Sequence, residues 1–210
     1  MKKEAKNNAV GFKLPKKINV AGYEYKVVVV PDNTVYKDIN TSGFLGRHCY
    51  SNKEILINEK AFSNWQNVKS VFFHELAHGL YYYCGAWDAS NNEVVCQCSA
   101  VEWCKSFDLR GEDELEVPKR VWMNERWFSV SDKTGKFDGE EYEGIDYSKF
   151  MIKIGKPVNG YNWMQIFNLY PVWAGQFAAV LGLGKRWRDD SVFMHGLALR
   201  LMELFKFREG

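Results

Sequence analysis

The order of apolar and polar positions predicts β-structure in the N-terminal part of the chain. Residues 18–30 are rich in Val and Tyr with one Ala-Gly break, a pattern typical of a strand or a hairpin, and Pro31 ends it. Residues 31–47 are expected to form a loop with a short helix. Residues 53–58 (KEILIN) form a short apolar run bounded by polar residues, which predicts a second strand.

Three later segments have the pattern of helices. Residues 65–83 form a long stretch that follows a Ser63-Asn64 capping pair and stops before Gly85. Residues 93–107 follow a second capping pair, Asn91-Asn92. Residues 189–207 are amphipathic and begin at an Asp pair suited to cap a helix. The chain is therefore expected to mix helices with short strands.

An acidic run at residues 111–116, followed by Pro118, indicates a boundary. We expect residues 1–13 to be a flexible basic arm and residues 14–108 to be one α+β domain. In that domain a small antiparallel sheet packs on the long helix, and a further helix follows. Residues 117–210 are expected to form a second α+β domain.

The C-terminal half resembles a degenerate repeat of the N-terminal half. Most matches are of residue class, and strands and helices of any α+β protein share such patterns, so two unrelated domains are the alternative. The matched segments are 14–18 with 117–121, 23–27 with 126–130, 50–57 with 147–154 and, at a constant offset of 98, 65–107 with 163–205.

Composition and charge narrow the function classes. The 210 residues are 46% hydrophobic and 26% charged, as in an ordinary globular protein, and the net charge of +2 is too small to indicate nucleic acid or an anionic membrane. The longest apolar stretch, about residues 172–184, is shorter than the roughly 20 residues of a membrane helix. The N-terminus has no apolar secretory segment, and the five cysteines are odd in number, so we expect reduced thiols and a cytoplasmic location.

The motif that carries chemistry is HELAH, residues 74–78. His74 and His78 are four residues apart, so a helix places both imidazoles on one face, where they can bind one zinc ion. Glu75 is rotated by about 100° and reaches a zinc-bound water as general base. Apolar residues surround the motif, as a buried helix requires. The alternative is a His/Glu pair that is satisfied inside a helix bundle.

A catalytic zinc requires a third protein ligand. Glu93 is the favoured residue, because it lies in the first turn of the next helix and a short loop folds that helix back toward His78. A carboxylate there also suits the helix dipole. Gln97, one turn later, could orient Glu93. The competing third ligands are Asp88, Glu102 and His195.

These features together resemble the zincin metallopeptidase superfamily, and in particular the small phage- and prophage-type zinc peptidases related to ImmA/IrrE. The resemblance covers about residues 14–107. HExxH occurs in many peptidases, so the resemblance to the superfamily is better supported than the resemblance to the subfamily. The matching features, in chain order, are the strand region 18–30, the glycine-containing turn 43–46, the I-x-I strand 55–57, the motif 74–78 and Glu93.

The resemblance implies a zinc-dependent metallopeptidase that acts on a protein or peptide substrate. In zincins the strand beside the motif helix often pairs with an extended peptide, which here would be residues 54–58. His48, Tyr50 and Tyr82 are candidates for stabilising the oxyanion. Residues 108–210 lie outside the resemblance unless they are the degenerate copy, which would keep no zinc ligand.

Other function classes have weaker support. Cys96, Cys98 and Cys104 could hold a structural zinc, but C-x-C points two thiols to opposite sides of a helix. The basic run 185–188 could contact nucleic acid, although one such cluster in a near-neutral chain is usually a solvated loop. The main alternative to a peptidase is a non-catalytic, phage-type accessory or interaction protein with a zincin-like core.

Overall fold

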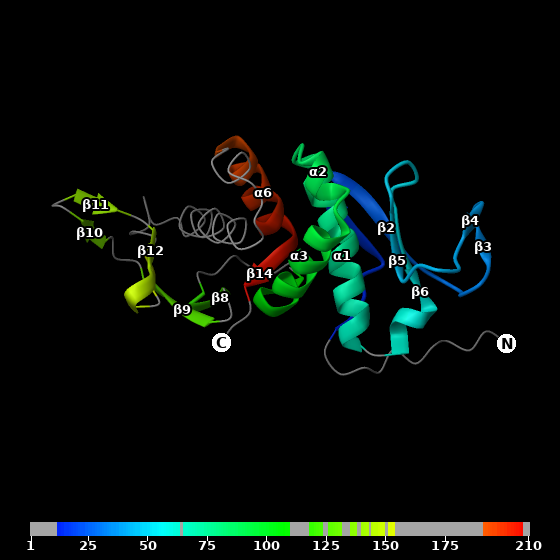
Figure 1. The fold of residues 1–210 in the computed structure, drawn as a ribbon, viewed down its shortest axis with the longest axis horizontal. Helices are drawn as coiled ribbons and strands as arrows, with labels where there is room; N and C mark the ends of the chain where they lie inside the picture. The colour runs from blue at the N-terminus through cyan, green and yellow to red at the C-terminus, as the bar shows by residue number, and fades with distance from the viewer. Residues whose placement is uncertain are drawn as a thin grey trace.

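The computed structural model has an α+β fold in which one helix, α1, is packed between a sheet and other helices (Figure 1). The basic arm as far as residue 11, Asn64, the acidic run, the segment 172–188 and the Asp pair before the last helix lie outside the described residues. The model describes residues 12–63, 65–109, 118–123, 126–131, 135–137, 140–142, 144–149, 151–153 and 191–207.

The first sheet has four strands in the order β1-β2-β6-β5. β1 (Lys17–Val20) and β2 (Tyr23–Val30) form a hairpin, one of the two alternatives that the sequence left open, and Ala21 and Gly22 both have positive φ in its turn. β6 (Glu54–Asn58) pairs parallel to β2 and antiparallel to β5 (Gly46–Cys49), so the sheet is mixed and the expectation of an antiparallel sheet is wrong. All five residues of β6 are buried, because β6 has a neighbouring strand on each side and α1 on one face.

The short helix expected within residues 31–47 is absent, and that prediction is wrong. The segment instead forms a small hairpin of β3 (Val35–Tyr36) and β4 (Ile39–Asn40), with Lys37 and Asp38 at positive φ in its turn. The hydroxyl of buried Thr41 donates to the Pro31 carbonyl at 2.7 Å and holds the hairpin closed. β5 and the 3-10 helix η1 (Glu59–Ser63) complete this part of the chain.

The two predicted helices are confirmed. α1 spans Trp65–Tyr83, and Gly85, with φ of +79°, takes the chain out of it. The one-turn helix α2 (Trp87–Ser90) reverses the chain, and α3 (Glu93–Ser106) runs back along α1. Asn92 caps α3 by accepting hydrogen bonds from two backbone N–H groups.

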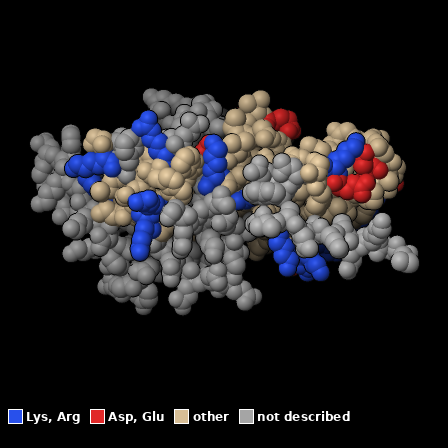
Figure 2. All heavy atoms as spheres, turned by 90° about the horizontal axis from the view of Figure 1, so that it is seen from below, with Lys and Arg blue, Asp and Glu red and all other residues tan. Residues whose placement is uncertain are grey.

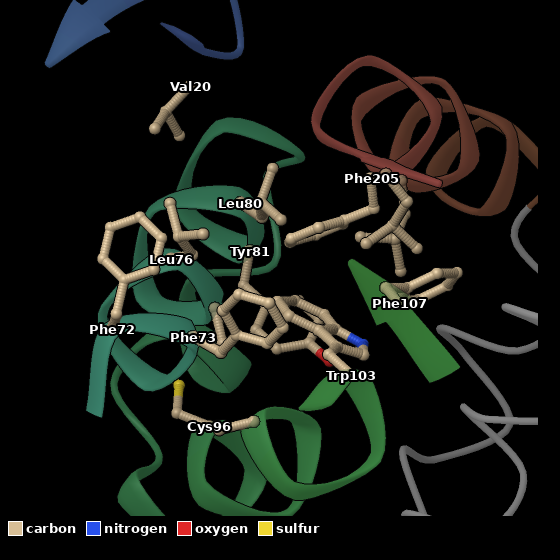
Figure 3. Close-up of a cluster of buried hydrophobic side chains, with 14 of the residues drawn as sticks. Val20, Phe72, Phe73, Leu76, Leu80, Tyr81, Cys96, Trp103, Phe107 and Phe205 are labelled. Carbon is tan, nitrogen blue, oxygen red and sulfur yellow. The ribbon is translucent and has the colours of Figure 1, made fainter. Parts of the chain in front are cut away.

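Large aromatic side chains fill the core between the helices. Figure 3 shows Phe73 and Tyr81 of α1 facing Trp103 of α3 and Phe205, while Phe72 lies on the other side of α1. These side chains are almost completely buried, so they exclude water from one face of the motif helix. The Tyr81 hydroxyl is satisfied by a 2.8 Å hydrogen bond with Ser99.

The described C-terminal elements form a second four-stranded sheet and a helix. α3 ends one residue earlier than expected, because Phe107 begins β7 (Phe107–Leu109), which pairs antiparallel with β14 (Phe205–Phe207). Likewise α6 covers Ser191–Leu204, shorter than the expected 189–207. The second sheet has the strand order β12-β13-β9-β8. Its strands are β8 (Arg120–Met123), β9 (Arg126–Ser131), β12 (Gly144–Asp146) and β13 (Met151–Lys153). A separate two-stranded sheet consists of β10 (Gly135–Phe137) and β11 (Glu140–Tyr142), and the 3-10 helix η2 (Tyr147–Lys149) lies between β12 and β13 in the chain.

The two four-stranded sheets share their strand pairing as well as their order. Each has an antiparallel hairpin, a parallel central pair and an antiparallel fourth strand. The registers agree at the positions that the sequence matched, and α3 and α6 begin and end 98 residues apart. The matching pairs are Lys17↔Lys26 with Arg120↔Ser129, Val27↔Ile55 with Val130↔Ile152, and His48↔Ile55 with Ile145↔Ile152.

Candidate metal centre

Three side chains from α1 and α3 meet at one point. His74 Nε2 lies 3.0 Å from His78 Nε2 and 3.0 Å from Glu93 Oε2, and His78 Nε2 lies 3.6 Å from Glu93 Oε1. A tetrahedral zinc with ligands at 2.0–2.1 Å has ligand atoms about 3.3 Å apart, so these spacings fit one such ion. Within the described part of the chain, this is the one group of three such side chains with metal-ligating geometry.

The surroundings of His78 leave one of its nitrogens available to a metal. Its Nδ1 lies 2.5 Å from the backbone carbonyl of Ser90, and because a carbonyl can only accept, Nδ1 carries the proton. In the neutral ring, Nε2 therefore has a free lone pair directed at the cluster. Ser90 is held in turn, since its hydroxyl donates to the His78 carbonyl at 2.9 Å. This is the support that metal-ligating histidines usually have.

The surroundings of His74 favour its neutral form. Burial lowers its pKa, and the nearby His78 lowers it further, while Glu93 acts in the opposite direction. The neutral imidazole is the form that binds metals. Gln97 lines the same cleft, and its side chain interacts with His74 and raises the pKa of that histidine. In the described chain, no hydrogen bond joins Gln97 to Glu93. The expectation that Gln97 orients Glu93 is therefore not met.

Glu75 lies beside this cluster and is 5% exposed. Burial raises the pKa of its carboxyl group to about 8, and the negative charge of Glu93 adds to the effect. A hydrogen bond from the backbone of His48 and the charge of Arg47 act in the opposite direction. Glu75 is thus a desolvated carboxyl group next to three metal-ligand candidates.

Two glycines make room for this arrangement, and the sequence analysis missed their role. A Cβ atom on Gly46 of β5 would lie 2.5 Å from the Glu75 carboxylate, and one on Gly79 of α1 would overlap the His48 ring. Only glycine therefore lets β5 approach α1 this closely. Gly79 directly follows the motif, and a glycine inside a helix is the signal that could have revealed this contact.

The three candidates for stabilising the oxyanion, His48, Tyr50 and Tyr82, have different surroundings. The Nδ1 of His48 lies 2.8 Å from the backbone carbonyl of Glu75, so it is the protonated nitrogen, and Nε2 can only accept. Burial lowers the pKa of His48 to about 4, which keeps it neutral and unable to donate from Nε2. Tyr50 lines the cleft, but its hydroxyl is 3.1 Å from Ser90 Oγ. Tyr82 does not line the cleft, and its ring lies between Tyr50 and Trp87.

The cluster opens into a cleft of about 730 Å³. α1 forms its floor, residues 43–48 form one wall, and residues 90–93 with Gln97 form the other. The strand on the first wall is β5, which is an edge strand of the first sheet, whereas β6 has neighbours on both sides. The expectation that residues 54–58 pair with an extended peptide is therefore wrong, because the backbone groups of β6 are already used within the sheet.

Two of the competing ligands, Asp88 and Glu102, do not join the cluster. Asp88 is exposed on α2, and Glu102 forms an ion pair with Lys105 at 3.1 Å. His195 lies on α6, and its side chain is outside the described ones. The five cysteines are free thiols, Cys96 buried and Cys98 exposed, so they do not form a second metal group in the described chain.

Comparisons of this protein with protein-family models, with curated proteins and with solved structures found no match. Among the described residues, no helix has the length and apolar character needed to span a membrane. On the face drawn in Figure 2, the Lys and Arg side chains among the described residues lie in separate groups. The assignment of function therefore depends on the metal-ligand geometry and the cleft.

Proposed function

We propose that the protein is a zinc-dependent metallopeptidase of the HExxH class, with a zincin-like core. The observation that carries the proposal is the convergence of His74 Nε2, His78 Nε2 and the Glu93 carboxylate beside buried Glu75. Two imidazoles and one carboxylate, next to an open cleft, are a typical ligand set of a catalytic zinc. A cytoplasmic protein or peptide is the proposed substrate.

In this proposal His74, His78 and Glu93 hold the zinc. Zinc in such a site lowers the pKa of a bound water to about 7 and polarises a substrate carbonyl. Glu75 accepts the proton of the attacking water and passes it to the leaving amine. Because a cation beside a buried carboxyl group favours its ionised form, metal binding also makes Glu75 available as a base.

The cleft supports an extended peptide as the substrate. An edge strand has backbone groups without a neighbouring strand, and β5 presents such an edge beside Glu75. An extended peptide can add to this edge and so bring a carbonyl group over the cluster. This moves the proposed peptide-binding strand from residues 54–58 to residues 46–49.

We further infer that the second half is a degenerate copy without a metal site. The shared registers of the two sheets support the repeat. At the offset of 98, none of the residues in the positions of His74, Glu75, His78 and Glu93 is a usual zinc ligand. These residues are Val172, Trp173, Gln176 and Ser191. The proposal therefore expects one zinc per chain.

Metal analysis by mass spectrometry, on protein purified without added metal, tests the site. Wild type and Glu75→Gln are expected to hold one zinc per chain, and Glu93→Ala much less. Glu102→Ala is the matched control, because it removes a carboxylate from the same helix outside the cluster. No zinc in wild type, even after reconstitution, would overturn the metal site. Zinc retained by Glu93→Ala would exclude Glu93 as the third ligand.

Hydrolysis of unfolded casein and of a quenched fluorescent peptide library tests the reaction. Glu75→Gln is expected to lower the rate by about 10²–10⁴-fold while the zinc content is unchanged. If the wild type holds zinc but hydrolyses no more substrate than Glu75→Gln does, the peptidase proposal is wrong. The non-catalytic accessory role would then be the better description.

A further inference from the structure

The cleft carries one fixed positive charge, on Arg47. Among the residues that line it, Arg47 is the one Lys or Arg. It lies on β5, between Gly46, which adjoins the Glu75 carboxylate, and His48, which is hydrogen-bonded to the Glu75 backbone. Because side chains alternate along a strand and Gly46 and His48 face α1, the Arg47 side chain lies on the other face of β5. A peptide that adds to the edge of β5 would place every second side chain on that same face, within reach of Arg47.

Arg47 has no partner of its own within the described chain. It is exposed, and none of the ion pairs or side-chain hydrogen bonds formed by the described residues uses its guanidinium. Three lysines of the first sheet and its loops differ from Arg47, since Lys37, Lys60 and Lys17 each pair with a carboxylate at 2.6–2.7 Å. An unpaired guanidinium at the edge of a cleft is free to bind a ligand.

The charge balance of the cleft favours an anionic ligand. The acidic residues that line it are Glu75 and Glu93, and a bound zinc ion would balance both. The opposite wall offers neutral polar groups, among them Asn91 and Gln97. Arg47 is then the uncompensated charge, and its planar fork matches a carboxylate in a bidentate manner.

We propose that Arg47 binds a carboxylate of the substrate, close to the peptide bond that is cleaved. The carboxylate is either an acidic side chain or the C-terminal carboxylate of the peptide. This inference depends on the proposed peptidase function, and it names the substrate class of that site. It assigns Arg47 to substrate selection, since His74, His78, Glu93 and Glu75 already account for the metal and the proton.

The test uses zinc-loaded protein and a set of fluorescent peptides with one common apolar sequence. Each peptide carries Glu, Gln or Lys at one position near its centre, and each is made with a free or an amidated C-terminus. Cleavage rates are measured with wild type, and binding to the Glu75→Gln variant is measured by fluorescence anisotropy. The protein variants are Arg47→Gln, Arg47→Lys and, as the matched control, Lys26→Gln, which removes an exposed charge from β2 outside the cleft.

The expected result is a roughly tenfold preference for Glu over Gln, or for the free over the amidated C-terminus. Arg47→Gln should abolish this preference, Arg47→Lys should weaken it and Lys26→Gln should leave it unchanged. A preference for Glu over Gln indicates that Arg47 binds an internal acidic side chain, whereas a preference for the free C-terminus indicates that it binds the terminal carboxylate.

Three outcomes distinguish this inference from the proposed function. Cleavage without a carboxylate preference, or with a preference that Arg47→Gln retains, overturns the role of Arg47 and leaves the peptidase intact. Binding that depends on both a carboxylate and Arg47, without cleavage by wild type, overturns the peptidase and supports the carboxylate site. Failure of every peptide to bind or be cleaved overturns the inference.

Discussion

Phe107 and Phe205 stack on each other with ring centroids 5.3 Å apart and an interplanar angle of 12°. The two residues are 98 positions apart, the offset that also relates α3 to α6, so they are equivalent positions of the proposed repeat. Each begins a short strand, and the two strands pair antiparallel around Asp108 and Lys206. Equivalent residues in contact are the mark of a two-fold arrangement, here within one chain.

This contact predicts energetic coupling between the two halves. Phe107→Ala and Phe205→Ala should each lower the free energy of unfolding by about 3–4 kcal/mol, since both side chains are fully buried. A double-mutant cycle should give a coupling of about 1 kcal/mol. Urea unfolding measures both, and Leu199→Ala, on the exposed side of α6, is the control. Separate unfolding transitions for the two halves would contradict the coupling.

Two helical glycines should respond to alanine in opposite directions. Gly79→Ala should lower the free energy of unfolding by roughly 1–3 kcal/mol, because the new methyl group overlaps the His48 ring. Gly196→Ala, on α6, meets nothing within 4 Å and should raise it by about 0.5–1 kcal/mol. Thermal unfolding of both variants is the measurement. A stabilising Gly79→Ala would show that α1 and β5 are not in close contact.

His48 predicts a dependence of stability on pH. Its pKa is about 4 in the folded protein, below the ordinary 6.5, because it is buried. Between these values the unfolded chain binds more protons, so stability is full above about pH 6.5 and is lost as the pH falls toward 4. His48→Gln should reduce this loss by roughly 2–3 kcal/mol. Urea unfolding of metal-free wild type and variant, from pH 4 to 7, gives the difference, and parallel pH curves would contradict it.

The cap of α3 should influence metal binding. Asn92 accepts hydrogen bonds from Val94 and Val95 and fixes the first turn, where Glu93 lies. Asn92→Ala should cost about 1 kcal/mol of stability and weaken zinc binding, whereas Asn92→Asp should preserve both. Competition with a zinc chelator measures the affinity. Unchanged affinity in Asn92→Ala would show that Glu93 is positioned without the cap.

The local part of the candidate site could be predicted from the sequence. The four-residue spacing of His74 and His78 needs only a regular helix to bring their Nε2 atoms together, and the Asn cap and short loop place Glu93 beside them. The roles suggested for His48, Tyr82 and Gln97 depended on contacts between elements. In the structure His48 bonds to a backbone carbonyl, Tyr82 packs among other rings, and Gln97 acts on His74 and not on Glu93.

By itself, the sequence determined the first hairpin, the helices α1 and α3 and the metal-ligand spacing, because turn preferences, caps and helical periodicity act over a few residues. Tertiary structure alone decided that β5 is an edge strand, that Phe107 leaves its helix to pair with β14, and that Arg47 stands in the cleft. Strand order and close approach depend on partners far away in the chain. No local sequence pattern shows which strand lies at the edge of a sheet, or which glycine packs directly against a carboxylate.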